Sequence, residues 1–268
     1  MTTEELIAAR RAEPWREALR KSKKNKERTD IPRVEMNELD AEYRSHPRLE
    51  EVNLGLTKEQ AMQEAQRCLD CPNPTCMQGC PVSINIPTFV KNIERGEFLE
   101  AARVLKETSA LPAVCGRVCP QEKQCESKCI HLKMGKPAVA IGYLERFAAD
   151  YERESGNISI PEVAEKNGIK IAVVGSGPAG LSFAGDMAKR GYDVTVFEAL
   201  HEIGGVLKYG IPEFRLPNKI VDVEIEGLRK MGVKFMTNCI VGKTISYDDL
   251  HADGFKGIFA ASGAGLPN

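Results

Sequence analysis

Two stretches, CLDCPNPTCMQGCP at residues 68–81 and CGRVCPQEKQCESKC at residues 115–129, determine how the first half of this sequence folds. They contain eight of the nine cysteines, at internal spacings of two to five residues. Thiolates are the soft ligands that iron–sulfur clusters need, and four of them can hold one cluster. Two stretches that share two clusters would be fastened to each other, so the pattern predicts a small helical domain held together by clusters.

Two structural zinc sites are the alternative, because zinc also binds four cysteines, usually as two pairs with short internal spacings. Only Cys68 and Cys71 have such a short spacing, and both stretches contain a Cys-Pro junction, which also ends bacterial ferredoxin runs. The pattern therefore favours iron–sulfur clusters. We interpret the nearest histidines, His46 and His131, as surface residues, and the ninth cysteine, Cys239, as a small buried apolar residue.

Helical signals surround the cysteine stretches. A capping box that begins at Thr57 predicts the start of one helix, and Pro87 predicts the start of a second. The second helix is interrupted at a glycine and resumes at residues 98–108. A third is predicted at residues 139–151, where apolar residues recur at helical spacing. The sequence thus predicts a helical domain over residues 1–155.

The N-terminal extension, residues 1–45, is polar and carries a run of basic residues. We interpret the run as a solvated helix face with a mobile linker, and a docking arm for an acidic partner subunit is the alternative. No aromatic residue is interleaved in it, which argues against single-stranded nucleic acid as a ligand. The basic residues are Arg16, Arg20, Lys21, Lys23, Lys24, Lys26 and Arg28.

The second domain, predicted over residues 168–268, begins with a β-branched run that leads directly into the loop VVGSGPAG at residues 173–180. Gly175 permits the tight turn, Gly177 lets the backbone approach a pyrophosphate, and Gly180 allows the helix to pack closely on the strand. The free N–H groups at the helix N-terminus can then bind phosphates.

A carboxylate completes the dinucleotide fingerprint. Glu198 lies 18 residues beyond Gly180, at the end of the next predicted strand, where it can hold ribose hydroxyls. Further strands are predicted at residues 232–235 and 257–261, and strands that alternate with helices indicate a parallel α/β sheet. The candidate nucleotide-binding residues are Gly175, Ser176, Gly177, Pro178, Ala179, Gly180, Glu198, Gly204, Gly205 and Gly263.

Two features favour FAD over NAD as the nucleotide in this domain. The pair Gly204-Gly205 soon after Glu198 resembles flavin-dependent enzymes that bind two dinucleotides. Residues 259–264 resemble their second flavin-contacting segment. Each feature by itself would also suit an ordinary turn.

Composition and charge exclude several other classes of function. The formal net charge is −1, so no overall field attracts the chain to nucleic acid or to an anionic membrane. No apolar stretch is long enough for a membrane span, and residues 1–11 lack the apolar segment of a secretory signal. We therefore expect a cytoplasmic protein. No hydrolytic constellation stands out, and we predict no catalytic residue.

Taken together, these motifs resemble the small (beta) subunit of NADPH-dependent glutamate synthase. The same family includes the flavin subunit of ferredoxin:NADP oxidoreductase and the N-terminal half of dihydropyrimidine dehydrogenase. The resemblance runs from about Arg33 to the C-terminus. Its most specific stretches are Arg67–Cys71, Gly79–Pro81, Gly116–Pro120 and Tyr209–Pro217.

The resemblance implies two 4Fe–4S clusters whose ligands cross between the two stretches. One cluster would be held by Cys68, Cys71, Cys76 and Cys129. The other would be held by Cys80, Cys119, Cys125 and a non-cysteine ligand that falls on Glu145. Counting cysteines alone selects Cys115 as the eighth ligand, and it stays the alternative to Glu145.

The resemblance also implies the fold and the reaction. We expect an α-helical, ferredoxin-like iron–sulfur domain followed by an incomplete Rossmann-like FAD-binding domain. The family continues into an NADPH-binding domain for which this sequence has no second glycine fingerprint, so the chain alone is expected not to use NADPH. In the complete protein, electrons would pass from NADPH through FAD and the clusters to the large (alpha) subunit of glutamate synthase. The alternative is a non-catalytic docking module that keeps clusters or zinc for its shape.

Overall fold

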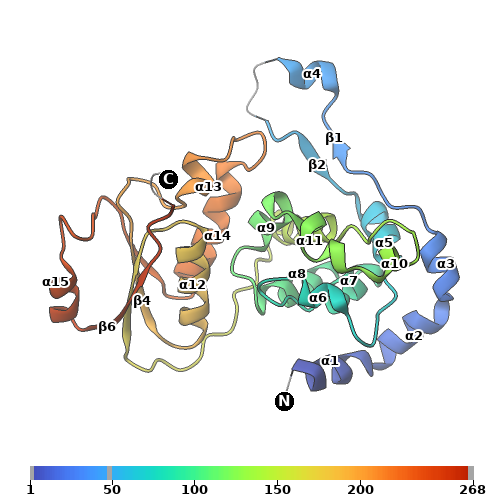
Figure 1. Cartoon of the computed structure of the whole chain (residues 1–268), viewed down its shortest axis with the longest axis horizontal. Coiled ribbons are helices and arrows are strands. Elements are labelled where there is room, and N and C mark those ends of the chain that lie inside the picture. The colour runs from blue at the N-terminus through green and yellow to red at the C-terminus, as the bar shows by residue number, and fades with distance from the viewer. Residues whose placement is uncertain (1–2, 47–49, 265–268) are drawn as a thin grey trace. The chain divides into compact units, whose positions relative to one another are not determined.

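The computed structural model describes residues 3–46 and 50–264 of the chain. They form two compact units, one mainly of residues 1–159 and the other mainly of residues 160–268 (Figure 1). The first unit is helical and the second contains a parallel sheet, so the predicted fold class is confirmed. Within the described ranges, no helix has the length and apolar character needed to cross a membrane.

The helical unit is built around helices that the sequence predicted. The capping box is present: Thr57 Oγ1 accepts from Gln60 N at 3.2 Å, and Gln60 Oε1 accepts from Thr57 N at 2.9 Å. Asn85 caps the second helix, which has a proline in its first turn, and Gly156 ends the last one with φ +73°. These main helices are α5 (Lys58–Gln66), α7 (Ile86–Glu94), α8 (Phe98–Lys106), α9 (Pro112–Val118) and α11 (Ile141–Ser155).

Short elements connect the main helices. The pair β1 and β2 is antiparallel, and the two 3-10 helices η1 and η2 lie in the second cysteine stretch. The connecting elements are β1 (Asn37–Glu38), α4 (Ala41–Ser45), β2 (Asn53–Gly55), α6 (Thr75–Gln78), η1 (Gln121–Lys123), η2 (Glu126–Lys128) and α10 (Ile130–Lys133).

The core of the helical unit forms where the apolar faces of α5, α7, α8 and α11 meet. Phe98 packs edge-on against Phe147 and Tyr151, with ring centroids 5.0 and 4.9 Å apart. Helix α9 approaches α11 closely, because a Cβ on Gly116 would lie 2.6 Å from the backbone of Arg146. This core holds the two cysteine stretches in fixed positions.

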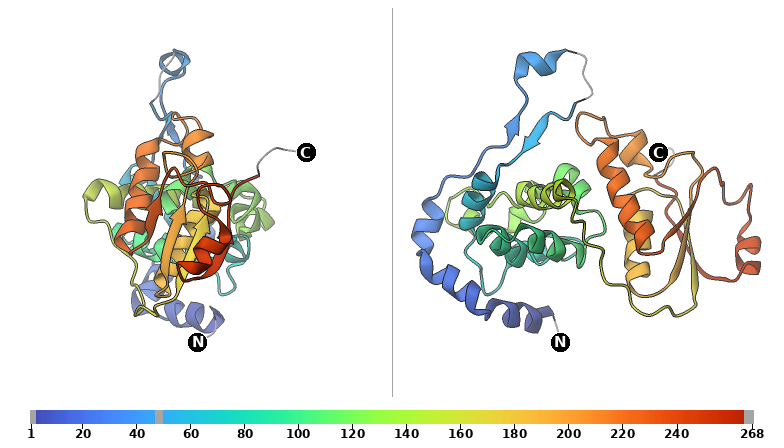
Figure 2. Two further views of the ribbon diagram at one scale, coloured as in Figure 1. Left: turned by 90° about the vertical axis from the view of Figure 1, so that its left-hand side faces the viewer. Right: turned by 180° about the vertical axis from the view of Figure 1, so that it is seen from behind.

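The N-terminal helices α1 (Thr3–Arg11), α2 (Pro14–Ser22) and α3 (Asn25–Asp30) form a continuous arm, residues 3–30, along the outside of the helical unit (Figure 2). The prediction of a solvated face is wrong for Arg16 and Arg28, which are both buried. Arg28 Nη1 donates to Glu94 Oε1 at 2.8 Å and to the Gln66 carbonyl at 2.7 Å. Part of the basic run is therefore partnered by buried groups of its own domain, whereas Lys21, Lys24 and Lys26 are exposed as predicted.

The second unit has four parallel strands in the order β5-β4-β3-β6. Helices α12 and α14 lie side by side on one face of the sheet, and α15 lies on the other (Figure 2). The strands are β3 (Lys170–Val174), β4 (Asp193–Phe197), β5 (Lys234–Met236) and β6 (Phe255–Ala260). The helices are α12 (Pro178–Lys189), α13 (Val206–Tyr209), α14 (Asn218–Lys230) and α15 (Tyr247–Ala252).

The central strand β3 carries the glycine loop at its carboxyl end. It pairs in register with β4, Lys170 opposite Asp193 and Val174 opposite Phe197. A Cβ on Gly180, in the first turn of α12, would lie 2.0 Å from the Gly175 carbonyl oxygen. A glycine is therefore required where the helix leaves the strand.

Replacement of Gly180 by alanine should destabilise the α/β unit by about 1–3 kcal/mol, because the added methyl group overpacks the strand–helix junction. The matched control is Gly227→Ala in α14, where an added Cβ meets no atom within 4 Å. That change should stabilise the unit by about 0.5–1 kcal/mol, since alanine has the higher helix propensity. Chemical denaturation of the two variants measures both effects, and equal stability of the two would contradict the packing argument.

Candidate cluster and nucleotide sites

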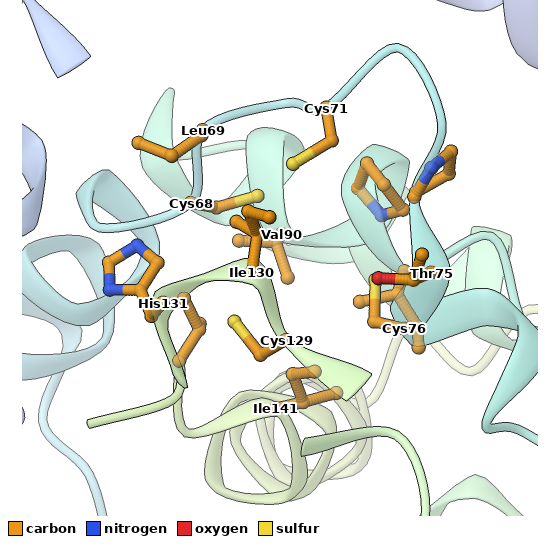
Figure 3. A pocket seen from close by; sticks show the side chains of 14 residues that line it. Cys68, Leu69, Cys71, Thr75, Cys76, Val90, Cys129, Ile130, His131 and Ile141 are labelled. Carbon is orange, nitrogen blue, oxygen red and sulfur yellow. The ribbon is translucent and has the colours of Figure 1, made fainter. Parts of the chain in front are cut away.

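A cavity in the helical unit brings together cysteines from both stretches. Cys68, Cys71 and Cys76 line it from the first stretch and Cys129 from the second, and their sulfur atoms surround one space (Figure 3). Counting all space between the lining atoms, the cavity measures about 420 Å³. The four residues expected to hold the first cluster thus line one cavity.

The rest of the cavity wall is almost entirely apolar. It is formed by side chains such as Ile86, Val90 and Ile141 from α7 and α11 (Figure 3). Four thiols on an apolar wall suit a cluster, because soft sulfur ligands need no water and exclusion of solvent influences the potential. Among the described residues, no group of three or more His, Cys, Asp or Glu side chains is arranged to hold a single metal ion, whereas the ligands of a cluster of several irons lie further apart.

One histidine lies in the cavity wall, contrary to the sequence prediction. His131 is buried, and its Nε2 lies 3.0 Å from the Arg67 carbonyl oxygen, whereas His46 is exposed as expected. Burial is the main reason that the pKa of His131 is lowered, and the positive charge of Arg67 adds to the effect. In the sequence, the position of His131 only two residues after Cys129 could have indicated that it lies beside the thiols.

Burial raises the pKa of the cavity thiols. It raises the pKa of Cys68 to about 12, although the positive charge of Lys91 acts in the opposite direction. The pKa values of Cys71 and Cys76 are raised as well, again mainly by burial. Because a metal ligand must be a thiolate, binding of iron at this cavity has to release protons.

The residues expected to hold the second cluster also influence one another. Burial and then the carboxylate of Glu145 raise the pKa of Cys119 to about 11, and Cys80 acts in the same direction. The pKa of Cys125 is raised by burial, by Glu126 and by Glu145. Glu145 itself is buried in α11, whereas glutamate side chains are mostly exposed in proteins.

The two candidates for the eighth ligand differ in their surroundings. Glu145 acts electrostatically on both Cys119 and Cys125. The groups that act on Cys119 besides its burial are Glu145, Cys80 and Glu122. Cys115 lies in α9, where its carbonyl oxygen accepts from Gln121 Nε2 at 2.7 Å. The choice between Glu145 and Cys115 as the eighth ligand stays a prediction.

The glycine loop of the second unit borders a larger, open cavity of about 1460 Å³ on the same measure. Gly175 has φ +102°, and a Cβ there would lie 2.3 Å from the Ala261 carbonyl oxygen. A Cβ on Gly177 would meet no atom within 4 Å. Gly177 therefore leaves open space where a pyrophosphate can approach the backbone at the start of α12.

Glu198 is tied to the loop that it was predicted to complement. Its Oε2 accepts from Ser176 N at 2.9 Å and from Ser176 Oγ, and its Oε1 accepts from Leu200 N at 2.9 Å. Oε2 already accepts two hydrogen bonds, so Oε1, which accepts one, is the oxygen that keeps a lone pair for a ribose hydroxyl. Ser176 Oγ in turn accepts from Gly204 N at 2.9 Å, which links the loop to the glycine pair.

Most of the predicted nucleotide-binding residues reach the cavity. Gly180 and Gly204 do not line it and act by close packing instead. Cys239, predicted to be buried, is half-buried in the cavity wall, and its N–H donates to the Glu198 carbonyl at 2.9 Å. The predicted residues that line the cavity are Gly175, Ser176, Gly177, Pro178, Ala179, Glu198, Gly205 and Gly263.

Sequence reasoning missed the apolar part of the cavity wall. Leu200, Val206, Tyr209 and Ile240 line it and are also largely exposed. They come from segments that meet only after the sheet has formed, so no local pattern marked them.

Comparisons with known proteins agree with this division of the chain. Residues 45–157 match the family described as dihydropyrimidine dehydrogenase domain II, 4Fe–4S cluster, and residues 173–231 match the NAD(P)-binding Rossmann-like domain. The NAD-dependent dihydropyrimidine dehydrogenase subunit PreT of Escherichia coli (strain K12) is 39% identical over 222 residues, 82% of this chain and 53% of that protein. The glutamate synthase (NADPH) small chain of the same organism is 38% identical over 214 residues, 80% of this chain and 45% of that protein.

The chain spans about half the length of the curated relatives it matches. Among solved structures, histamine dehydrogenase from Rhizobium sp. 4-9 aligns over 67% of this chain and 23% of its own, with 21% identity and a TM-score of 0.36. That structural likeness is too weak to bear on the fold, whereas the sequence relatives confirm the resemblance to glutamate synthase small chains.

Replacement of Gly177 by alanine should weaken dinucleotide binding about ten- to hundredfold without lowering stability, because the methyl group enters only the space left for the pyrophosphate. FAD titrated into the full chain and followed by flavin fluorescence measures the affinity. Gly227→Ala is the control, because it makes the same substitution in α14, at a residue that does not line the cavity. Unchanged FAD affinity in Gly177→Ala would show that the nucleotide does not pass over this loop.

Proposed function

We propose that this chain, whose homologues include glutamate synthase small chains and PreT-type oxidoreductase subunits, transfers electrons between FAD and two 4Fe–4S clusters. It combines a 4Fe–4S-type domain with an NAD(P)-binding Rossmann-like domain, as oxidoreductase subunits of this kind do. The observation that carries the proposal is the cavity in which four thiols from two distant stretches surround one space on an apolar wall.

The first cluster would be held by Cys68, Cys71, Cys76 and Cys129. Because Cys129 comes from the other stretch, the loaded site would join α6 and α10 through metal–sulfur bonds in addition to their packing. The thiols are protonated at neutral pH when no metal is bound, since burial raises their pKa. A bound metal cation reverses that preference, because a coordinating thiol is deprotonated outright.

The second cluster would be held by Cys80, Cys119 and Cys125, with Glu145 as the fourth ligand. The proposal is supported by the burial of the Glu145 carboxylate and by its electrostatic effect on Cys119 and Cys125. An oxygen ligand changes the charge and hydrogen bonding of a cluster and therefore its potential. The two clusters would then differ in potential.

FAD is proposed for the cavity at the glycine loop. The N–H groups at the start of α12 would bind the pyrophosphate, and Glu198 would hold a ribose. Hydride and one-electron chemistry are supplied by the flavin and the clusters when they are bound. The residues of this chain bind and orient these groups and exclude water from the thiol cavity.

The complete protein would take electrons from NADPH or NADH and pass them to a partner subunit. The proposed partner is the large subunit of glutamate synthase, and a dihydropyrimidine dehydrogenase partner or a ferredoxin-linked one is the alternative. The PreT subunit and the glutamate synthase small chain are equally close to this chain, at 39% and 38% identity. The final acceptor must therefore be decided by assay of the complete protein with each partner.

The full chain should be purified without oxygen, and its iron, sulfide, zinc and flavin counted. About eight irons per chain with bound flavin would support both cofactor sites. Iron without flavin would restrict the proposal to the cluster domain. Zinc in place of iron, under strictly anaerobic handling, would overturn the electron-transfer function.

Replacement of Cys129 by serine should reduce the iron content from about eight to about four per chain, because only the first cluster loses a ligand. Cys115→Ser is the matched control and should keep about eight. Glu145→Gln should lower the content of the second cluster or shift its spectrum. If Cys115→Ser loses iron while Glu145→Gln keeps it, Cys115 is the eighth ligand.

A further inference from the structure

Three arginines of the N-terminal arm converge on Asp70, one of the two residues between the first two cysteines. Asp70 is fully buried and has φ +49°, a left-handed backbone that few residues other than glycine adopt readily. Arg16 pairs with its Oδ1, and Arg20 Nη1 lies 2.6 Å from its Oδ2. Arg11 Nε donates to its carbonyl oxygen at 2.9 Å. The arm therefore holds the Cys68–Cys71 loop by its side chain and by its backbone.

A second group of charges, the buried pair of Lys91 and Glu94 in α7, contacts the same loop. Lys91, fully buried in α7, donates from Nζ to the Cys68 carbonyl oxygen at 2.6 Å and to Glu94 Oε2 at 2.5 Å. The other oxygen of Glu94 accepts from Arg28, which belongs to the arm. The arm thus reaches the cysteine loop at Asp70 directly and at Cys68 through Glu94 and Lys91.

The charges of these two groups do not balance. The cations are Arg11, Arg16, Arg20, Arg28 and Lys91, and the carboxylates are Asp70 and Glu94. Five cations against two carboxylates leave a local excess of three positive charges. The neighbouring pair of Arg67 and Glu64 adds no net charge. Arg16, Arg28 and Lys91 are buried and Arg11 and Arg20 partly buried, and charges in both situations are screened much less by salt than exposed ones.

We propose that the arm, residues 3–30, is a functional part of the first cluster site, where its arginines raise the reduction potential of the cluster at Cys68, Cys71, Cys76 and Cys129. This inference rests on the proposed function, since it requires that a cluster is bound there. A 4Fe–4S cluster with four thiolate ligands carries net negative charge, and the electron that reduces it adds one more. Nearby fixed cations therefore stabilise the reduced form.

The cations reach this cavity through the loop that carries two of its four cysteines. Lys91 Nζ donates to the Cys68 carbonyl oxygen at 2.6 Å, and Arg11 Nε donates to the carbonyl oxygen of Asp70, the residue before Cys71, at 2.9 Å. Arg11, Arg16, Arg20 and Lys91 are accordingly positioning residues, since they act through the loop and the field and do not ligate iron.

The decisive comparison is between two neighbouring residues of α2. Arg20→Gln removes a cation from Asp70, whereas Lys21→Gln removes one from a side chain that is 76% exposed and pairs with Glu17 at the surface. The charge change is identical. For charges on the order of 12 Å apart at an effective dielectric constant of about 20, loss of one cation changes an equilibrium constant about tenfold. A tenfold change in one-electron reduction corresponds to 59 mV.

The measurement is a potentiometric titration of the full chain, loaded with clusters and followed by electron paramagnetic resonance. We expect Arg20→Gln to lower the equilibrium constant for reduction of one centre about tenfold and to leave the other centre unchanged. Lys21→Gln should match the unsubstituted chain at both centres. Equal potentials in Arg20→Gln and Lys21→Gln would overturn the inference.

The direction in which a second variant shifts the reduction potential separates a charge effect from a mechanical one. Asp70→Asn keeps the size of the side chain and tolerates the left-handed backbone, but removes a negative charge, so the potential should rise. A clamp that acted only mechanically would shift Asp70→Asn and Arg20→Gln in the same direction or lose iron in both. If Asp70→Asn does not fold, Arg20→Gln and Lys21→Gln decide the question by themselves.

Failure of the inference can be told apart from failure of the proposed function. A chain without variants that binds no iron, or gives no reducible cluster signal, contradicts the proposed function. A chain that gives two reducible centres, neither of which responds to Arg20→Gln, contradicts only the role of the arm.

Discussion

The helical unit depends on one geometric constraint: Cys129 must reach the cavity formed by Cys68, Cys71 and Cys76, which lie more than fifty residues earlier in the sequence. Helices α7 and α11 make this possible, because their apolar faces form one core on which both stretches rest. Since the cavity wall is apolar, the core that folds the unit is also the surface that lines the site. Some of the residues that pack the core of this domain therefore also form the wall of the site.

Burial of charged side chains is energetically unfavourable, and in this arrangement the buried charges also fix the position of the loop that carries the first cysteines. Arg16, Arg28, Lys91 and Asp70 are buried, and each would be strongly unfavourable without its partners. Every one of them contacts a loop or helix next to the first cysteines, and none would be needed to form an apolar core. Their charged groups thus lie where they fix the position of a loop and the sign of the field around it.

The sequence predicted the features that depend on local chemistry. The capping box at Thr57, the glycine loop at residues 173–180 and the order of strands and helices each follow from a few neighbouring residues, and all are present. The burial of Arg16 and of His131 could not be predicted, because it depends on partners 54 and 64 residues away, Asp70 and Arg67. A basic run reads as solvated when its partners are unknown, since isolated arginines are almost always exposed.

In the nucleotide site, too, contacts within the chain fix the position of a side chain that is proposed to bind a ligand. Ser176 is fully buried although it lines the cavity, and it joins Glu198 to the loop and to Gly204. The carboxylate that is proposed to hold a ribose is therefore already oriented by its own chain, and binding does not have to order it. Pre-organisation of this kind increases affinity, because the conformational entropy has been lost on folding and not on binding. In both units, contacts within the chain fix the groups around a site before any cofactor occupies it.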